Sequence, residues 1–256
     1  MTDTLEPEDG GFDPFGKDRD VVARTRPRLQ SLVERWLRLS VEGAMATVPA
    51  GPVIFVANHG GALPWDALVL FSALATHVGR EVRPLVEDPV ITAPFLGTLM
   101  ARLGAVRASQ DNATRLLADG EAIVVFPEGM QGLGKTWRRR HQLQRFGRGG
   151  FVRLAVRTGA PLVPVAVIGG EETSPLFGKV EALKALLPPT APWLPITPVV
   201  PLPARWRIRV GEAIDARATV TDEADAIGVN ALAAQVRDRI QKDVRELVEA
   251  RGNAWL

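Results

Sequence analysis

Hydrophobic positions along the chain fall into short continuous runs that alternate with longer stretches at helical spacing. The runs are rich in β-branched residues and bounded by Gly, Pro or charged residues, which predicts buried strands. They cover residues 39–42, 53–57, 82–86, 122–126, 162–168 and 206–210. Apolar residues recurring every three or four positions predict helices over 66–78, 91–103, 109–117, 151–157, 182–187 and 222–250. This alternation predicts an α/β fold with a mixed, largely parallel sheet flanked by helices.

Three segments depart from this pattern. Residues 1–18 are rich in Asp, Glu, Gly and Pro and predict a disordered acidic tail, which leaves 19–256 as a single domain. Residues 19–39 predict a basic amphipathic helix, which either packs on its own core or lies in a membrane interface. Residues 173–204 are apolar but rich in proline, which excludes a regular helix or a central strand. That segment is expected either to cover the core irregularly or to dip into lipid.

Composition narrows the class of protein without identifying a partner. A hydrophobic content of 46% supplies a sizeable core, and the absence of cysteine excludes disulfides, thiolate nucleophiles and Cys-ligated metals. The formal charge of +2 indicates no partner by itself. No apolar run reaches the roughly 20 residues of a spanning helix, and the acidic N-terminus does not resemble a secretory signal. We therefore expect a cytoplasmic protein, either soluble or attached peripherally to a membrane.

The candidate chemistry follows two of the predicted strands. Asn58-His59-Gly60-Gly61 comes directly after strand 53–57, and Phe126-Pro127-Glu128-Gly129 ends strand 122–126. Ligands of open α/β sheets bind at such strand ends. An imidazole there can take a proton from a hydroxyl near neutral pH, and the nearest acid, Asp66, can orient it. The alternative is structural: Asn58 and His59 cap a strand, and Asp66 opens a helix.

These motifs resemble the glycerolipid and lysophospholipid acyltransferase family. The resemblance rests on Asn58-His59 followed by an Asp, on Phe126-Pro127-Glu128-Gly129 and on the late strand block 159–167, and it spans about residues 40–215. Six residues separate His59 from Asp66, whereas the commonest form of the family has four. The longer spacing is similar to that of monoacylglycerol and diacylglycerol acyltransferase-like proteins.

The resemblance implies a glycerol-3-phosphate acyltransferase-like fold and transfer of an acyl group from a thioester to a lipid hydroxyl. His59 is then the general base and Asp66 its orienting acid. Asn58, Gly60, Gly61 and the 126–129 motif are expected to bind substrate, with Glu128 accepting hydrogen bonds from the acceptor. The expected oxyanion donors are backbone N–H groups around Gly60, Gly61 and the Gly129 loop.

The resemblance also bears on the co-substrate and on the acceptor. Coenzyme A or acyl carrier protein serves as the acyl carrier, and no cofactor or metal is implied. Gln131 stands where phosphate-selective members of the family have Arg, which favours an unphosphorylated acceptor. Alternatively, Lys135 or Arg138 substitutes for that Arg and keeps a lysophospholipid possible.

Two rival interpretations remain open at this level. Residues 129–136 match the P-loop pattern of NTPases, although Glu128 precedes the loop and a basic run, not an apolar-faced helix, follows it. The basic run at 135–148 can also recognise phosphates of coenzyme A or of lipid headgroups. Nucleic acid is not indicated, because no RNA- or DNA-binding motif accompanies the run. The second rival is a non-catalytic, membrane-associated scaffold that uses the basic helix and the basic run.

Overall fold

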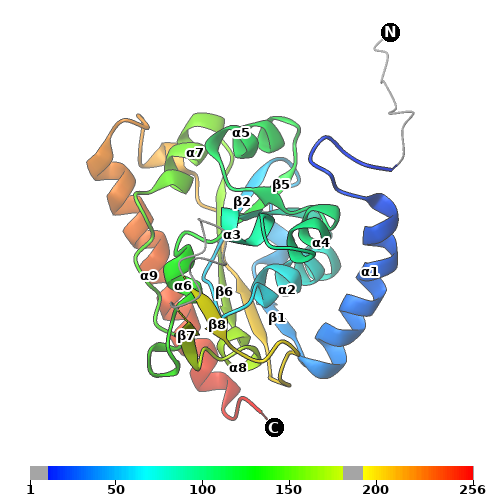
Figure 1. Ribbon diagram of the computed structural model, residues 1–256. Helices are drawn as coiled ribbons and strands as arrows, with labels where there is room; N and C mark the ends of the chain where they lie inside the picture. Colours follow the sequence, from blue (N-terminus) through cyan, green and yellow to red (C-terminus); the bar gives the residue numbers. More distant parts are fainter. Residues whose placement is uncertain (1–10, 181–192, 256) are drawn as a thin grey trace.

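The fold is known from a computed structural model that describes residues 11–180 and 193–255. A seven-stranded sheet forms its centre, in the order β1-β9-β6-β2-β5-β3-β4 (Figure 1). The strands are β1 (Ser40–Gly43), β2 (Val53–Ala57), β3 (Val82–Val86), β4 (Val106–Arg107), β5 (Ala122–Val125), β6 (Leu162–Ile168) and β9 (Arg207–Val210). Neighbours from β6 to β4 pair in parallel, whereas β9 runs antiparallel to β6 and carries β1 parallel to itself. The predicted mixed, largely parallel sheet is confirmed.

Helices cover both faces of the sheet and bury a separate core on each. The helices are α1 (Arg19–Ser31), α2 (Trp65–Ala73), α3 (Asp88–Ile91), α4 (Leu96–Arg102), α5 (Gln110–Ala118), α6 (Met130–Leu133), α7 (Gly150–Thr158), α8 (Gly170–Thr173) and α9 (Ala226–Arg251). Short π-helical turns extend α1 through Leu32–Trp36 and α2 through Leu74–Val78. Side chains from α1, α2 and α4 fill one core, and side chains from α5, α7 and α9 fill the other.

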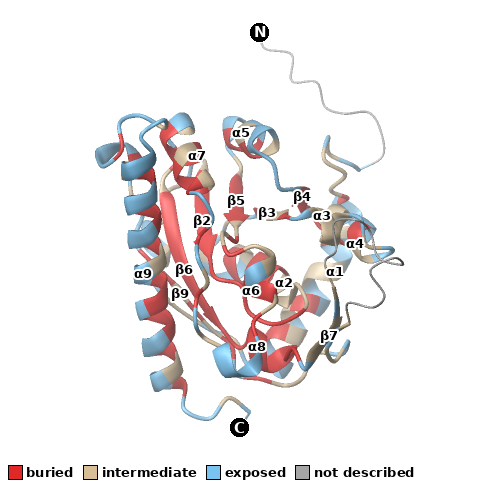
Figure 2. Ribbon diagram, turned by 60° about the vertical axis from the view of Figure 1, so that its left-hand side comes forward, coloured by how far each residue is buried: buried red, intermediate tan, exposed pale blue. Residues whose placement is uncertain are grey.

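The central strand β2 shows how the sequence pattern produces these two cores. All five of its residues are buried; Val53, Phe55 and Ala57 face the first core, and Ile54 and Val56 face the second. Successive side chains of a strand point to opposite faces, so a strand covered on both sides is apolar throughout. Figure 2 shows the buried strands between the helices, and α9 with a buried inner side and an exposed outer side.

The N-terminal region departs from the prediction. Residues 11–18 are ordered, because the Asp13 carboxylate pairs with the buried Arg83 and Asp18 caps α1 by accepting from the N–H groups of Asp20 and Val21. Residues 1–10 lie outside the described part. The predicted basic helix is present, and its buried Val22 and Leu29 join the core.

Two further segments differ from the prediction. The single helix expected over 91–103 is wrong, because residues 92–95 separate α3 from α4, with Pro94 in the break and Phe95 at a φ of 60°. Within 173–204, a two-stranded antiparallel ribbon forms from β7 (Gly178–Val180) and β8 (Leu194–Ile196). The helix expected at 182–187 lies outside the described residues. Over the ranges that the structure describes, no helix is both long and apolar enough to cross a membrane.

Candidate active site

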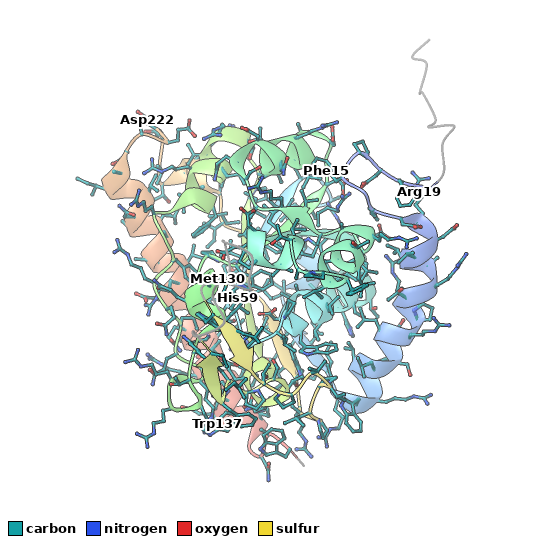
Figure 3. All side chains as sticks on the ribbon, in the orientation of Figure 1. Phe15, Arg19, His59, Met130, Trp137 and Asp222 are labelled. Carbon is teal, nitrogen blue, oxygen red and sulfur yellow. The ribbon has the colours of Figure 1, made fainter. Side chains whose placement is uncertain are left out.

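The two predicted motifs meet where β2 and β5 end. These strands are paired in parallel, with Val56 opposite Val125, so His59 and the 126–129 motif emerge from the same edge of the sheet. The imidazole of His59 stacks on the ring of Phe126, with centroids 4.2 Å apart and an interplanar angle of 10°. Figure 3 shows His59 beside Met130, the first residue of α6, at this edge.

His59 and Asp66 form a hydrogen-bonded pair despite the six residues between them. The His59 Nδ1 lies 2.6 Å from the Asp66 Oδ2, and Asp66 is fully buried in the first turn of α2. The same carboxylate accepts from the backbone N–H of Gly60 at 3.0 Å and, through its Oδ1, from that of Ala67 at 2.8 Å. Three donors therefore hold the carboxylate in place, and His59 can present its Nε2 to a substrate.

Glycines bring the loop between the pair back onto the protein. Gly61 has a φ of 87°, and a Cβ on it would lie only 2.3 Å from the carbonyl oxygen of Gly170. A Cβ on Gly170 would in turn lie 2.4 Å from the carbonyl oxygen of Gly60. The backbone of the loop thus packs directly on the start of α8, and Ala62 donates to the carbonyl of Ser174 at 2.8 Å. This close approach allows a longer spacing to reach the same His–Asp contact.

Glu128 lies under the His59 backbone. Its side chain is fully buried; Oε1 accepts from the N–H of His59 at 2.9 Å, and Oε2 accepts from the N–H of Gln144 at 2.6 Å. Burial raises the pKa of this carboxyl, against the opposing charge of Lys135. In this arrangement the carboxylate positions His59 and does not line the cavity beside it.

Lys135 is also buried in this network. Its ammonium donates to the carbonyl of His59 at 2.6 Å and lies 3.3 Å from Glu171 and 3.5 Å from Glu128. Burial lowers the pKa of Lys135, but attraction to Glu171 and Glu128 outweighs it and the net shift is upward. The sequence indicated neither Glu171 nor Gln144, because nothing in the local pattern places Glu171 beside Lys135, 36 positions earlier, or Gln144 beside Glu128, 16 positions earlier.

The P-loop interpretation fails on this geometry. Residues 130–133 form one helical turn, and a short 3-10 turn (Trp137–Arg139) follows Lys135, where a P-loop requires a long helix. The ammonium that would bind phosphate is paired internally with two carboxylates. Arg138 is exposed on the 3-10 turn and does not line the cavity beside His59.

Asn58 links two strands. Its amide donates to the carbonyl of Val167 at 2.9 Å and accepts from the N–H of the same residue at 2.8 Å, with 1% of the residue exposed. The side chain therefore fixes the end of β2 against β6. Two expected oxyanion donors are already engaged, since Gly60 donates to Asp66 and Gly129 to the carbonyl of Phe126. The N–H of Gly61 has no partner among the described residues.

A cavity of about 410 Å³ opens beside His59. Its walls come from the ends of β3 and β5 and from α3, α5, α6 and α7, and they include Val90, Ala113, Phe126, Pro127, Met130, Leu133, Phe151 and Leu154. Apart from His59, the only ionisable side chain among the described lining residues is Glu87. The hydrogen-bonded pair of His59 and Asp66 therefore lies at the wall of a largely apolar chamber.

Gly132 permits close packing of α6 on both motifs. A Cβ on it would lie 2.6 Å from the Cβ of His59 and 2.8 Å from that of Glu128. Only a residue without a side chain lets α6 pack on both motifs at once.

A second charged cluster lies behind Glu171. His141 Nε2 is 3.0 Å from the carboxylate of Glu172, which also pairs with the guanidinium of Arg251. Burial works against the charged form, but His141 and Arg251 hold the pKa of Glu172 at about 2. Their oxygens and ring nitrogen, together with Glu171, lie close enough to hold a metal ion. However, each carboxylate already has a cationic partner within the protein, Arg251 for Glu172 and Lys135 for Glu171.

Comparison with known proteins agrees with this geometry. The family model described as acyltransferase matches residues 38–168. An uncharacterized protein of Mycobacterium tuberculosis is 39% identical over 269 residues, which cover 100% of this chain and 73% of that protein. An uncharacterized protein of Mycobacterium leprae is 38% identical, with 100% and 71% covered.

Two further comparisons are more distant. A chloroplastic 1-acyl-sn-glycerol-3-phosphate acyltransferase of Brassica napus is 27% identical over 134 residues, covering 48% of this chain and 35% of that protein. The crystal structure of PlsC, the 1-acyl-sn-glycerophosphate acyltransferase of Thermotoga maritima, superposes with a TM-score of 0.61 at 20% identity, covering 91% of this chain and 83% of the other. The last likeness shows a common fold.

Proposed function

Because this chain belongs to the acyltransferase family, we propose that it moves a fatty acyl group from an acyl thioester to a hydroxyl of a glycerolipid or lysophospholipid. The observation that carries the proposal is the His59–Asp66 pair, joined at 2.6 Å and placed at the wall of an apolar cavity. A P-loop NTPase and a non-catalytic membrane protein both leave this pair without a role.

The reaction proceeds by direct attack. His59 Nε2 takes the proton of the acceptor hydroxyl while its oxygen bonds to the thioester carbonyl carbon. The tetrahedral intermediate then expels the thiolate, which receives the proton from His59, so that an ester and a free thiol leave the site. Asp66 keeps the proton of the resting imidazole on Nδ1 and stabilises the imidazolium that forms. The N–H of Gly61, which has no partner in the described part of the chain, is the backbone donor assigned to the oxyanion.

The acyl chain is assigned to the cavity. A volume of about 410 Å³ lies in the usual range of ligand pockets, and walls of Val, Leu, Met and Phe suit a hydrocarbon. Either coenzyme A or acyl carrier protein delivers this chain. Since both are cytoplasmic carriers and the acceptor is a lipid, the proposal puts the enzyme at the cytoplasmic face of a membrane.

The acceptor is assigned to the unphosphorylated class. Among the described residues that line the cavity, Glu87 is the one acidic side chain, and neither lysine nor arginine is present. Phosphate recognition normally uses arginine or lysine, and a carboxylate repels a phosphate. Lys135 is paired internally and Arg138 lies on an exposed turn, so neither supplies the missing cation. A mono- or diacylglycerol, or another long-chain alcohol, fits better than a lysophospholipid.

The test is thiol release from acyl-CoA and acyl carrier protein donors in the presence of defined acceptors. We expect release that depends on a neutral acceptor, and His59→Ala should lower it by about 10²–10⁴-fold. His77→Ala, at an exposed histidine on the π-helical turn after α2, is the matched control and should retain the activity. Near-normal turnover in a folded His59→Ala variant contradicts the mechanism, and a preference for lysophosphatidic acid contradicts the acceptor class.

A further inference from the structure

Exposed aromatic and aliphatic side chains gather at one end of the molecule. Among the described residues, eight of the twelve large exposed hydrophobic side chains belong to segments that meet there: Trp36, Trp137, Phe177, Leu194, Ile196, Val199, Val200 and Trp255. We call these eight residues the apolar end face. Val199, Val200 and Phe177 are the most exposed, at 81%, 73% and 70%. A large exposed apolar patch of this kind marks an interaction site.

Two hydrogen bonds and one cation–π contact join the segments. Trp36 donates from its indole nitrogen to the carbonyl of Pro201 at 2.8 Å, next to Val200 in the chain. Arg38 donates to the carbonyl of Trp255 at 2.8 Å. The ammonium of Lys179 lies 4.7 Å from the centre of the Trp193 ring, which connects β7 to the residue preceding β8. Figure 1 shows β7, β8 and the C-terminus at the same end, and Figure 3 places Trp137 there.

The ribbon of β7 and β8 presents apolar residues outward. Leu194 and Ile196 are two positions apart, so they share one face of the ribbon, and both are exposed. An exposed two-stranded ribbon in water normally carries polar residues on its outer face. Tryptophan is concentrated here as well, since four of the six in the chain are at least partly exposed on these segments, namely Trp36, Trp137, Trp193 and Trp255. Tryptophan is typical of the boundary between lipid headgroups and hydrocarbon.

The charge around this face is strongly positive. Seven basic residues and one acid lie on the surface of the segments 34–39, 134–140, 177–180, 193–206 and 253–255. The basic residues are Arg35, Arg38, Arg138, Arg139, Arg140, Lys179 and Arg205, and the acid is Glu34. The whole chain has a formal charge of only +2, so the excess is local. Basic residues that ring exposed apolar side chains complement an anionic lipid surface.

We propose that the apolar end face docks on a bilayer that contains anionic lipids, with Phe177, Ile196, Val199 and Val200 entering the headgroup–hydrocarbon boundary. The tryptophans lie at the headgroup level, and the arginines contact lipid phosphates. This inference rests on the proposed function only for its consequence, the delivery of a lipid acceptor; docking itself follows from the surface.

The face is connected to the active site through α6. Gly134, directly after α6, approaches the ribbon so closely that a Cβ on it would lie 2.9 Å from the Lys179 ammonium and 3.4 Å from the Trp193 ring. Met130 and Leu133 of the same turn line the cavity, and Gly132 packs on His59. A bilayer held by the ribbon therefore lies one helical turn from the catalytic histidine.

The test is co-sedimentation with vesicles of phosphatidylcholine alone and of an equimolar mixture with phosphatidylglycerol. We expect binding to the mixture that weakens with added salt. The double variant Val199→Ser/Val200→Ser should bind on the order of 10–100-fold more weakly, because two inserted side chains are lost. Ile227→Ser, at a residue 85% exposed on α9 and away from this face, should bind as the wild type does.

Tryptophan fluorescence tests the wild-type chain without any variant. Insertion should shift the emission to shorter wavelength, and lipids brominated in their acyl chains should quench it. Absence of both effects, or equal loss of binding in the double variant and in Ile227→Ser, overturns the proposal. A dimer in sedimentation that the double variant converts to a monomer, with no vesicle binding by the wild type, also overturns it and assigns the face to a second copy.

Activity separates this proposal from the proposed function. The double variant should keep wild-type turnover on a short-chain, water-soluble acceptor and lose most of its turnover on an acceptor presented in mixed vesicles. If the wild type shows no turnover on either acceptor but binds vesicles as described, the acyltransferase reaction is wrong and the docking face stands. Equal turnover of both proteins on vesicles overturns the role of the face in delivering the acceptor.

Discussion

Lys135→Met removes the positive charge at the centre of the site while keeping an unbranched side chain of similar length. The lysine is 6% exposed and lies between the carboxylates of Glu171 and Glu128, at 3.3 and 3.5 Å. Removing one partner of a buried ion pair leaves uncompensated charge, which costs about 3–5 kcal/mol of unfolding free energy. At about 2–4 °C per kcal/mol for a chain of this size, the melting temperature should fall by about 6–20 °C.

The two carboxylates do not share this cost equally. Glu128 keeps two backbone donors, the N–H groups of His59 and Gln144. Glu171 keeps only the N–H of His141, at 3.3 Å, and its second oxygen is buried without a partner among the described residues. We therefore expect Glu171→Gln to restore most of the stability of Lys135→Met, and Glu128→Gln to restore less. A double-mutant cycle measures this coupling directly.

The pH dependence of the variant supplies an independent check. Burial raises the pKa of Glu128, and Lys135 opposes that shift, so the variant should raise it further. A carboxyl whose pKa is higher in the folded state than in the unfolded state stabilises the fold at low pH, and this contribution is lost as pH rises through the folded pKa. The unfolding free energy that Lys135→Met loses relative to the wild type should therefore be smaller near about pH 5 than near about pH 8.

These expectations are tested by urea unfolding at both pH values. The proteins compared are the wild type, the single variants Lys135→Met, Glu171→Gln and Glu128→Gln, and the two double variants that combine Lys135→Met with either glutamine substitution. A Lys135→Met protein as stable as the wild type would refute the assignment of Lys135 to a buried ion-pair network. The assignment would also be refuted if Glu171→Gln did not reduce the loss of stability caused by Lys135→Met. A deficit independent of pH would refute the role given to the carboxyl of Glu128.

Three other variants test the site. Asp66→Asn should lower turnover about 10²–10⁴-fold with little change in KM, because an amide cannot accept from all three donors that hold the carboxylate; wild-type kcat would contradict this. Gly132→Ala places a carbon 2.6 Å from the His59 Cβ and should lower turnover at least about tenfold, whereas Gly51→Ala, with no atom within 4 Å, should not. Glu172, whose pKa is held at about 2 against an ordinary 4.5, contributes about 3 kcal/mol of stability above about pH 4.5 and loses it as pH falls toward about 2. Glu172→Gln should therefore be less stable at neutral pH, with a gap that closes on acidification; a constant gap in urea unfolding would count against the pairing.

The elements of the fold were predictable where burial and periodicity agree. A strand such as β2 is covered on both faces and is apolar at all five positions, and its short, β-branched run favours a buried strand. The prediction failed where the backbone leaves a helix although the apolar residues keep helical spacing. The apolar residues of 91–103 keep helical spacing across the break at Pro94, and only the positive φ of Phe95 shows that the chain turns there.

The contact between His59 and Asp66 was predictable from the sequence, whereas the residues that support it were not. His59 follows β2 and Asp66 lies in the first turn of α2, seven positions later, so chemistry and short sequence separation identify them together. Glu171, Gln144 and Gly132 act through contacts made only after β2, β5 and β6 pair side by side. A single sequence carries no signal for such long-range contacts, because the residues concerned have ordinary local patterns.

The P-loop motif shows why residue types alone do not define a phosphate site. All the motif positions of 129–136 are present, and the motif follows a strand as it should. The residue before it decides the outcome, because Glu128 is buried beneath His59 and attracts the lysine inward. A phosphate would have to displace two carboxylates from Lys135 and enter a region that already holds the negative charge of Asp66. The same eight residues therefore supply a positive charge that supports the histidine backbone.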